Sequence, residues 1–310
     1  MAIRLTNIFG LLKNRIFILL SAVILSIVLP QAAIWSKHLM LPALAVVMTL
    51  ATTSVPNSFF SSGRALIAPS ISGLVMSYVI LTGTLLALAA IFIEDKNIWI
   101  GFVLIAGVPP AVAVIPFSAI LKGNVSYTVA GTVSTYLAAL FIMPVMFFIF
   151  VETEFNHTAK LIEALVLLII FPFFASRILL YFNLQEKIAS VRGVVTDWGF
   201  FIILYTMIGL NRDLLFARPM MILPVAAIIF AAVIVLGFLI ERAGILLKLG
   251  KDKITSLMLL GTLKNQGIAG GLAVTLFTEE AALPSAVYTV FMFLYFMLLD
   301  WRRRLGGASR

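Results

Sequence analysis

The stretch ITSLMLLGTLKNQGIAGGLAVTLF, residues 254–277, decides the fold of this chain. It is long enough for a helix to cross a bilayer, yet its middle holds Thr262, Lys264, Asn265 and Gln266 among four glycines. A lysine at mid-membrane costs roughly 2.5–3.5 kcal/mol on insertion scales, and such residues usually face a cavity or a pathway. Because the glycines weaken the helix where the polar groups gather, this segment is predicted to be a broken transmembrane helix that lines a site.

The composition of the whole chain agrees with a membrane location. Of its 310 residues 62% are hydrophobic and only 11% are charged, and the mean hydropathy is +1.14. These values exclude an ordinary soluble domain and are typical of a multi-pass membrane protein. The absence of cysteine excludes disulfides, thiolate metal sites and thiol nucleophiles. No nucleotide-binding loop, catalytic triad or metal cluster is recognisable, so we expect neither an enzyme nor a protein with a cofactor or bound metal.

Ten apolar segments follow one another along the chain. Each is near the length that spans the hydrocarbon core, and in lipid such segments must be helical because unpaired backbone groups are too costly there. The sequence therefore predicts an all-α membrane protein with ten transmembrane helices at 16–34, 40–55, 71–93, 98–121, 127–151, 161–182, 194–210, 220–240, 254–277 and 283–299.

The basic residues of the loops predict the orientation. The net charge of +9 lies in short loops and not on one soluble face, which favours the positive-inside bias over nucleic-acid binding. With the N-terminus inside, sixteen of the 22 lysines and arginines fall on the cytoplasmic side and five on the outer side, and Lys264 is the remainder. We expect a plasma (inner) membrane protein with both termini in the cytoplasm.

With five spans in each half, the second half enters the membrane from the opposite side, so two halves of similar layout, residues 1–155 and 156–310, are expected to be inverted repeats. In the fourth segment Pro109, Pro110 and Pro116 must interrupt the helix. Adding half the chain length, 155, to the first two positions gives Lys264 and Asn265. Interrupted segments at matching places in two halves are the best sequence indication of a transporter's substrate site. The fourth and ninth segments are therefore predicted to be two discontinuous helices that cross.

Lys264 has three possible roles in such a site. It could bind an anionic substrate directly, it could be a fixed positive charge where related proteins hold a cation, or it could carry a proton. Asp197, beside Trp198 at the start of the seventh segment, is either an interfacial residue or a cavity residue that pairs with Lys264. Thr128 and Thr132 belong to a hydroxyl-rich stripe of the fifth segment, a pattern that often joins helices.

At the two interrupted segments the chain resembles the bile acid:sodium symporter superfamily, whose members move organic anions. The residues that carry the resemblance are Pro109-Pro110 ahead of Lys122-Gly123-Asn124-Val125, and the stretch from Gly261 to Gly267. The resemblance extends over the whole chain in span number, length and break positions. It implies two inverted five-helix repeats, panel and core domains, and a substrate cavity beside the crossing helices.

The chain departs from the family pattern at the sodium ligands. The Pro-Gly-Gly of the fourth segment and its following Ser-Asn pair correspond here to Pro109-Pro110-Ala111 and then Val114 and Ile115; the glutamate and the Gln-Asn pair of the ninth segment correspond to Leu260, Lys264 and Asn265. The glutamine of the third segment falls near Val79. Of the ligands that the resemblance implies, Asn265, Thr128 and Thr132 remain. Hard cations need several oxygen ligands, so we expect transport without sodium coupling.

The function predicted is secondary transport of a small organic anion by alternating access, with Lys264 replacing the bound cation. The partners are the anion, the lipid bilayer and a proton if transport is proton-coupled; nucleic acid is excluded, and the oligomeric state is open. One alternative is a cation/proton antiporter, although it would need a carboxylate that the crossing segments lack. An arsenite extruder is disfavoured because the chain has no cysteine, and a non-transporting membrane sensor with the same fold remains open. The predicted substrate- or ion-binding residues are Lys264, Asn265, Gln266, Thr262, Pro109, Pro110, Thr128 and Thr132.

Overall fold

The computed structural model describes residues 10–53, 63–111, 113–151, 163, 166–217 and 219–307. All the regular secondary structure within these ranges is helical, as the composition predicts, and one isolated β-bridge joins Pro110 to Lys264. The predicted boundary between the two halves, at residues 155 and 156, lies outside the described residues.

Six helical segments are long and apolar enough to cross a membrane, and each overlaps one of six of the ten predicted spans. They are Pro30–Thr52, Ile67–Phe92, Val125–Phe150, Gln185–Leu210, Met220–Leu246 and Glu280–Leu305. Four shorter apolar helices lie within or over the other predicted spans, at Phe17–Val28, Lys96–Gly107, Val166–Tyr181 and Gln266–Leu276. The chain is a multi-pass helical membrane protein.

Several helix ends differ from the predicted ends for local reasons. Helix α2 (Arg15–Val28) stops before Pro30, because a residue that precedes proline avoids the helical conformation. Helix α11 (Gln185–Leu210) begins nine residues before the predicted span, which starts at Val194. Its first turns are polar, so hydropathy alone does not include them in a span.

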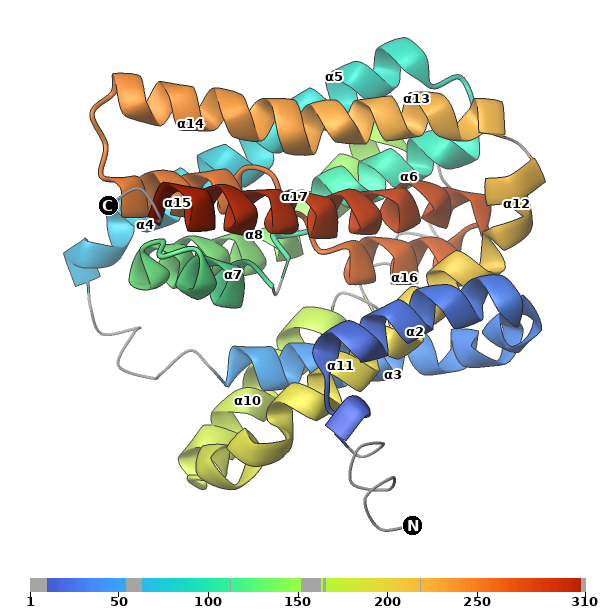
Figure 1. Cartoon of the computed structure of the whole chain (residues 1–310), viewed down its shortest axis with the longest axis horizontal. Helices are drawn as coiled ribbons and strands as arrows, with labels where there is room; N and C mark the ends of the chain where they lie inside the picture. The colour runs from blue at the N-terminus through green and yellow to red at the C-terminus, as the bar shows by residue number, and fades with distance from the viewer. Residues whose placement is uncertain are drawn as a thin grey trace.

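Four helices form one layer of the molecule, which we call the panel layer (Figure 1). In it α11 packs along both α2 and α3, and α10 packs on α3. The bounds of the two further helices are Ala33–Thr52 for α3 and Phe171–Tyr181 for α10.

The remaining long helices form a second group, the crossing bundle, drawn above the panel layer in Figure 1. Its helices are α4 (Ile67–Leu74), α5 (Thr82–Phe92), α6 (Lys96–Gly107), α7 (Val114–Ile120), α8 (Val125–Phe150), α13 (Pro219–Phe230), α14 (Leu236–Leu246), α15 (Lys251–Leu260), α16 (Gln266–Leu276) and α17 (Leu283–Gly307). Two π-helical stretches lie within its long helical segments: η4 (Val75–Leu81) continues α4 into α5, and η6 (Ala231–Val235) continues α13 into α14.

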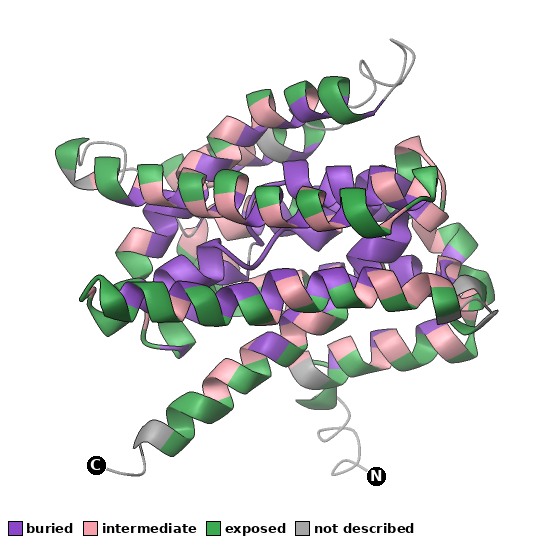
Figure 2. Cartoon of the chain, turned by 90° about the horizontal axis from the view of Figure 1, so that it is seen from above, coloured by how far each residue is buried: buried purple, intermediate pink, exposed green. Residues whose placement is uncertain are grey.

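Buried residues concentrate in the middle of the molecule, and the outward sides of the helices are exposed (Figure 2). Many of these exposed side chains are large and apolar; Phe148 and Met220, for example, are 83% and 84% exposed. In water so much apolar surface would drive aggregation, whereas in a bilayer it contacts lipid. The buried interior includes the segments between α6 and α7 and between α15 and α16.

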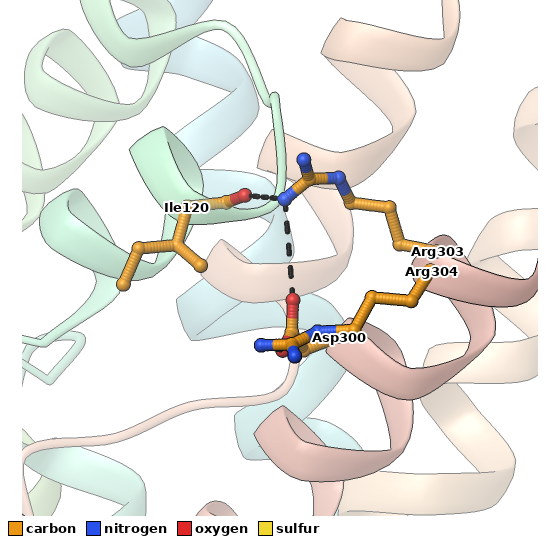
Figure 3. Close-up of polar contacts among 4 residues, drawn as sticks. All are labelled: Ile120, Asp300, Arg303 and Arg304. Carbon is orange, nitrogen blue, oxygen red and sulfur yellow. Dashed lines mark hydrogen bonds and ion pairs between the residues drawn. The ribbon is translucent and has the colours of Figure 1, made fainter. Parts of the chain in front are cut away.

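The last turns of α17 hold the end of α7 in place. Phe296 stacks on Phe117 with 3.9 Å between the ring centroids. Further along, Arg303 donates a hydrogen bond to the carbonyl of Ile120, and Asp300 forms ion pairs with Arg303 and Arg304 (Figure 3). An arginine at a helix C-terminus satisfies a carbonyl that has no intrahelical partner. The short helix α7 is thus fixed to the crossing bundle at its C-terminal end.

Candidate functional site

The two interrupted helices meet through their non-helical segments. Helix α6 ends at Gly107 and α7 begins at Val114, while α15 ends at Leu260 and α16 begins at Gln266. Both interruptions lie inside the segments predicted to be broken. The prolines account for the first, because they cannot donate to a helix and clash with the preceding turn.

Backbone hydrogen bonds join the two interruptions. The N–H of Asn265 donates to the carbonyl of Pro109 at 2.9 Å, and the N–H of Ala111 donates to the carbonyl of Leu263 at 3.2 Å. These bonds form the antiparallel bridge between Pro110 and Lys264. Backbone groups freed by a helix break inside a membrane must find hydrogen-bond partners within the protein. Here each interruption supplies some of the partners that the other needs.

Lys264 is completely buried at this crossing, and its ammonium has three partners. Nζ donates to the carbonyls of Ala106 and Val108, each at 2.9 Å, and lies 4.3 Å from the centroid of the Tyr78 ring. The two carbonyls belong to the C-terminal end of α6, where the helix dipole places partial negative charge, and the ring face is attractive to a cation. An ammonium has three N–H donors, so its coordination is complete.

No described carboxylate lies within 4 Å of the Lys264 ammonium. The carbonyl of Ala106 also accepts a hydrogen bond from Thr82 Oγ1 at 2.7 Å. The positive charge is therefore balanced by carbonyl dipoles and an aromatic ring, which is the type of environment that proteins also give to a bound alkali cation.

Asn265 organises the start of α16. Its Oδ1 accepts from the N–H of Ile268 and so caps the helix, and its Nδ2 donates to the hydroxyl of Tyr136 at 3.0 Å. That hydroxyl in turn donates to the carbonyl of Pro110 at 2.9 Å. Tyr136 of α8 thus connects the two interruptions through one oxygen atom.

Thr262 is buried beside the second interruption. Its Oγ1 donates to the carbonyl of Met258 within α15, and its own carbonyl accepts from the hydroxyl of Tyr288 at 2.6 Å. Tyr288 of α17 therefore stabilises the non-helical backbone. Thr262 presents no free hydroxyl proton to a ligand in this arrangement.

Gln266 has one satisfied and one unsatisfied end. Its Nε2 donates to the carbonyl of Lys264 at 3.3 Å, which fixes the orientation of the amide. Its Oε1 has no hydrogen-bond partner, although the residue is only 4% exposed. A buried acceptor without a partner costs free energy, and such a group beside a cavity is a candidate contact for a ligand.

Thr128 and Thr132 lie on α8 and are not among the contacts of Lys264. Thr128 Oγ1 donates to Ser118 Oγ of α7 at 2.9 Å, and Thr132 Oγ1 donates to the carbonyl of Thr128 at 2.7 Å. The structure therefore groups Lys264, Asn265 and Gln266 with the two prolines. Beside this group Thr128 joins α8 to α7, whereas the hydroxyl of Thr132 bonds within α8.

Two cavities open between the panel layer and the crossing bundle. The smaller one has a volume of about 50 Å³ and reaches Gln266 and Gly267 at the start of α16. Arg15, Ala113 and Phe200 line this cavity and also the larger one, which has a volume of about 290 Å³. The two spaces therefore adjoin one another.

Asp197 lines the larger cavity together with Arg15, its described ion-pair partner. Asp197 is 8% exposed, and its Oδ1 lies 3.4 Å from Nε of Arg15. The structure thus pairs this carboxylate with Arg15 of α2 and not with Lys264. Arg192 also lines the cavity, so two arginines oppose one aspartate there and the space favours anions.

Sequence reasoning did not identify the tyrosines of the site. Tyr78, Tyr136 and Tyr288 contact Lys264, Asn265 and the carbonyl of Thr262, yet each stands in an ordinary apolar segment. The one available signal is that a tyrosine hydroxyl buried in a membrane span requires a partner.

Comparison with known sequences places part of the described site within a matched family region. A family model described as Sodium Bile acid symporter family matches residues 41–218, which is more than half of the chain. No curated protein matches the chain. The matched region includes the first interruption, the π-helical segment with Tyr78, and Tyr136 of α8.

Proposed function

The chain belongs to the sodium bile acid symporter family, and from that premise we propose that it is a secondary transporter of a small organic anion that works without sodium. Lys264 takes the place of the bound cation, and alternating access exposes the site to the two sides of the membrane in turn.

The observation that carries this proposal is the coordination of Lys264. Its ammonium is held by two carbonyls at the end of α6 and by the Tyr78 ring, and it lines neither of the two cavities described above. This favours a fixed charge over a direct contact with substrate. The absence of a described acid within 4 Å likewise gives no support to a proton relay through this residue.

The residues that replace the family's sodium ligands support the same conclusion. Val114 and Leu260 are fully buried and apolar, and Ile115 offers no oxygen either. A hard cation exchanges its water for several protein oxygens, which these side chains cannot supply. A second positive charge near the ammonium would also be repelled.

Ten spans in two inverted repeats account for the helix pairing. In the first half α2 packs on α11 and α6 packs on α17; in the second half α10 packs on α3 and α15 packs on α8, which are the equivalent pairs with the halves exchanged. The π-helical stretches η4 and η6 and the two interruptions also occupy corresponding places. We place the repeats at residues 1–155 and 156–310, with the panel layer and the crossing bundle as the two bodies that move.

The loop charges support an orientation in which both termini lie in the cytoplasm. The membrane is the plasma membrane. The larger cavity lies beside Arg192, near the polar start of α11. In this orientation the conformation is open toward the cytoplasm.

Uptake of organic acids into liposomes tests the proposal. Purified protein is reconstituted, and flux is measured with sodium or with choline as the external cation. We expect equal rates in the two media, and we expect Lys264→Gln to reduce flux by at least tenfold because the site loses its charge. Lys253→Gln, an exposed lysine at the start of α15, is the matched control and keeps full activity.

A strict requirement for sodium contradicts the proposal, and so does full activity of the Lys264→Gln protein. Specific anion binding without flux in any medium would favour the sensor alternative instead.

A further inference from the structure

Arg15 occupies the junction between the two cavities. It is the first residue of α2, and its guanidinium carries five N–H donors. Among the described residues its one protein partner is Asp197, at 3.4 Å from Nε, which leaves the two terminal amino groups without a protein partner. A guanidinium with two parallel N–H groups available is suited to hold a carboxylate bidentately.

Asp197 occupies the position that an external carboxylate would take. Its side chain is 11% exposed and that of Arg15 is 38% exposed, so the pair lies at the edge of the larger cavity and not in the sealed interior. The 3.4 Å separation is longer than an optimal charge-assisted hydrogen bond. A ligand carboxylate could therefore replace Asp197 at Arg15 at a modest cost.

Gln266 provides a second contact in the smaller cavity. Gln266 Oε1 is buried there without a partner, while the other end of the same amide is held by the Lys264 carbonyl. Because this oxygen can only accept, it requires a donor from whatever occupies the cavity. Gln266 and Gly267, the first two residues of α16, both line this cavity. Their first-turn N–H groups have no intrahelical partner and can bind the oxygen of a hydroxyl.

Apolar side chains make up most of the rest of the lining of the smaller cavity. Leu19, Leu204, Met207, Met292 and Phe293 line the smaller cavity. They would surround the hydrocarbon part of a ligand and would exclude a second charge.

We propose, on the basis of the transport function inferred above, that Arg15 binds the carboxylate of the substrate in place of Asp197 and that Gln266 accepts a hydrogen bond from a hydroxyl on its apolar part. The substrate class is a small monocarboxylic acid with a short apolar body and one hydroxyl group. Asp197 occupies Arg15 when the site is empty.

Binding of three related acids to the purified protein tests this assignment. The acids are pentanoate, 2-hydroxypentanoate and 4-hydroxypentanoate, and affinity is measured by calorimetry in detergent, so that no flux is needed. We expect at least one hydroxy acid to bind on the order of tenfold more tightly than pentanoate, since it satisfies the buried Gln266 oxygen. Equal affinities for the three acids would overturn the role of Gln266.

Variants separate the two contacts. Gln266→Met keeps the side-chain length, and it should abolish the preference for the hydroxy acid while the affinity for pentanoate remains. Asp197→Asn should tighten the binding of all three acids because Arg15 loses its competitor, and weaker binding would refute the exchange. Arg15→Gln should abolish binding, and the double variant Arg15→Gln/Asp197→Asn repeats this test without leaving a carboxylate unpaired.

Lys13→Gln is the matched control for charge, because Lys13 is exposed two residues before Arg15 and should not alter binding. Unchanged binding in Arg15→Gln or in the double variant would overturn the carboxylate assignment. Flux that is insensitive to Arg15 and Gln266 would refute this inference and leave transport intact. Selective binding with no flux would instead refute the transport function and leave the binding site intact.

Discussion

Tyr136 is the clearest case of one side chain that supports the whole site. Its hydroxyl joins Asn265 Nδ2 to the Pro110 carbonyl, and so it connects α8 to both interruptions. Tyr136→Phe removes that oxygen alone and leaves a buried carbonyl and an amide N–H short of a partner. We expect the free energy of unfolding to fall by about 1–3 kcal/mol, measured as a lower melting temperature in detergent.

The control for Tyr136→Phe is Tyr181→Phe, since Tyr181 is 78% exposed on α10 and should melt like the wild type. Equal melting temperatures for the two variants would show that the Tyr136 bridge contributes nothing.

At the scale of residues, the sequence indicates the polar groups of the site but not their partners. Lys264, Asn265, Gln266, Pro109 and Pro110 are conspicuous in apolar segments, and the structure brings them together. Carbonyls and tyrosines complete the coordination, and neither is unusual in its own segment. That Asp197 faces Arg15 and not Lys264 depends on the rotation of α11, which hydropathy does not determine.

At the scale of elements, helices α4 and α8 approach closely at a pair of glycines. A Cβ added to Gly73 would lie 2.6 Å from the Cα of Gly131, whereas one added to Gly83 would meet nothing within 4 Å. We therefore expect Gly73→Ala to lower the melting temperature by several degrees. Gly83→Ala should leave it unchanged or raise it, because alanine favours the helix by up to about 1 kcal/mol. Similar effects of both substitutions would contradict this account.

Several hydrogen bonds of Asn124 join the starts of α8 and α15. Asn124 caps α8 and also donates to Asp252 Oδ2 at 2.9 Å, and this hydrogen bond lowers the pKa of Asp252 from its ordinary value of 3.8. A lowered pKa means that the ionised carboxylate stabilises the fold at neutral pH. That contribution is lost as the pH falls below 3.8 and through the folded-state pKa.

We expect the wild type to melt above Asp252→Asn at about pH 6 and the difference to shrink below pH 3.8. The control is Glu94→Gln, because Glu94 is exposed and forms no described ion pair. A difference between wild type and Asp252→Asn that does not change with pH would contradict the role of the hydrogen bond.

Hydropathy predicts that the apolar segments form helices, but it predicts the positions of the helix ends less well. The interruptions of the fourth and ninth segments follow from proline and glycine chemistry. The polar extension of α11 and the π-helical stretches η4 and η6 do not, because they depend on packing between helices.

At the scale of the whole molecule, the panel layer and the crossing bundle must move against one another if access alternates. The chain contains no cysteine, so a pair of introduced cysteines can be cross-linked without reaction at native thiols. Ala51 of α3 and Ile115 of α7 line the larger cavity from the two bodies. A reducible linker between Ala51→Cys and Ile115→Cys should abolish flux, and reduction should restore it.

The control pair is Ala51→Cys with Gly193→Cys, since both positions lie in the panel layer and line the same cavity. Linking them should leave most of the flux. Undiminished flux in the cross-layer pair would exclude a movement of one layer against the other.

In the sodium-independent cycle proposed above, the covalent attachment of the Lys264 ammonium would affect the energetics of transport. A dissociable ion crosses the membrane with its substrate and leaves on the far side, so its gradient drives accumulation. A lysine returns with the empty carrier and contributes no such gradient, so a monovalent anion transported alone carries a net negative charge across. Each 100 mV of membrane potential is then worth about 2.3 kcal/mol per charge, or about fiftyfold in concentration ratio. With the cytoplasm negative, this voltage drives the anion out of the cell, and the protein would act as an exporter powered by the membrane potential.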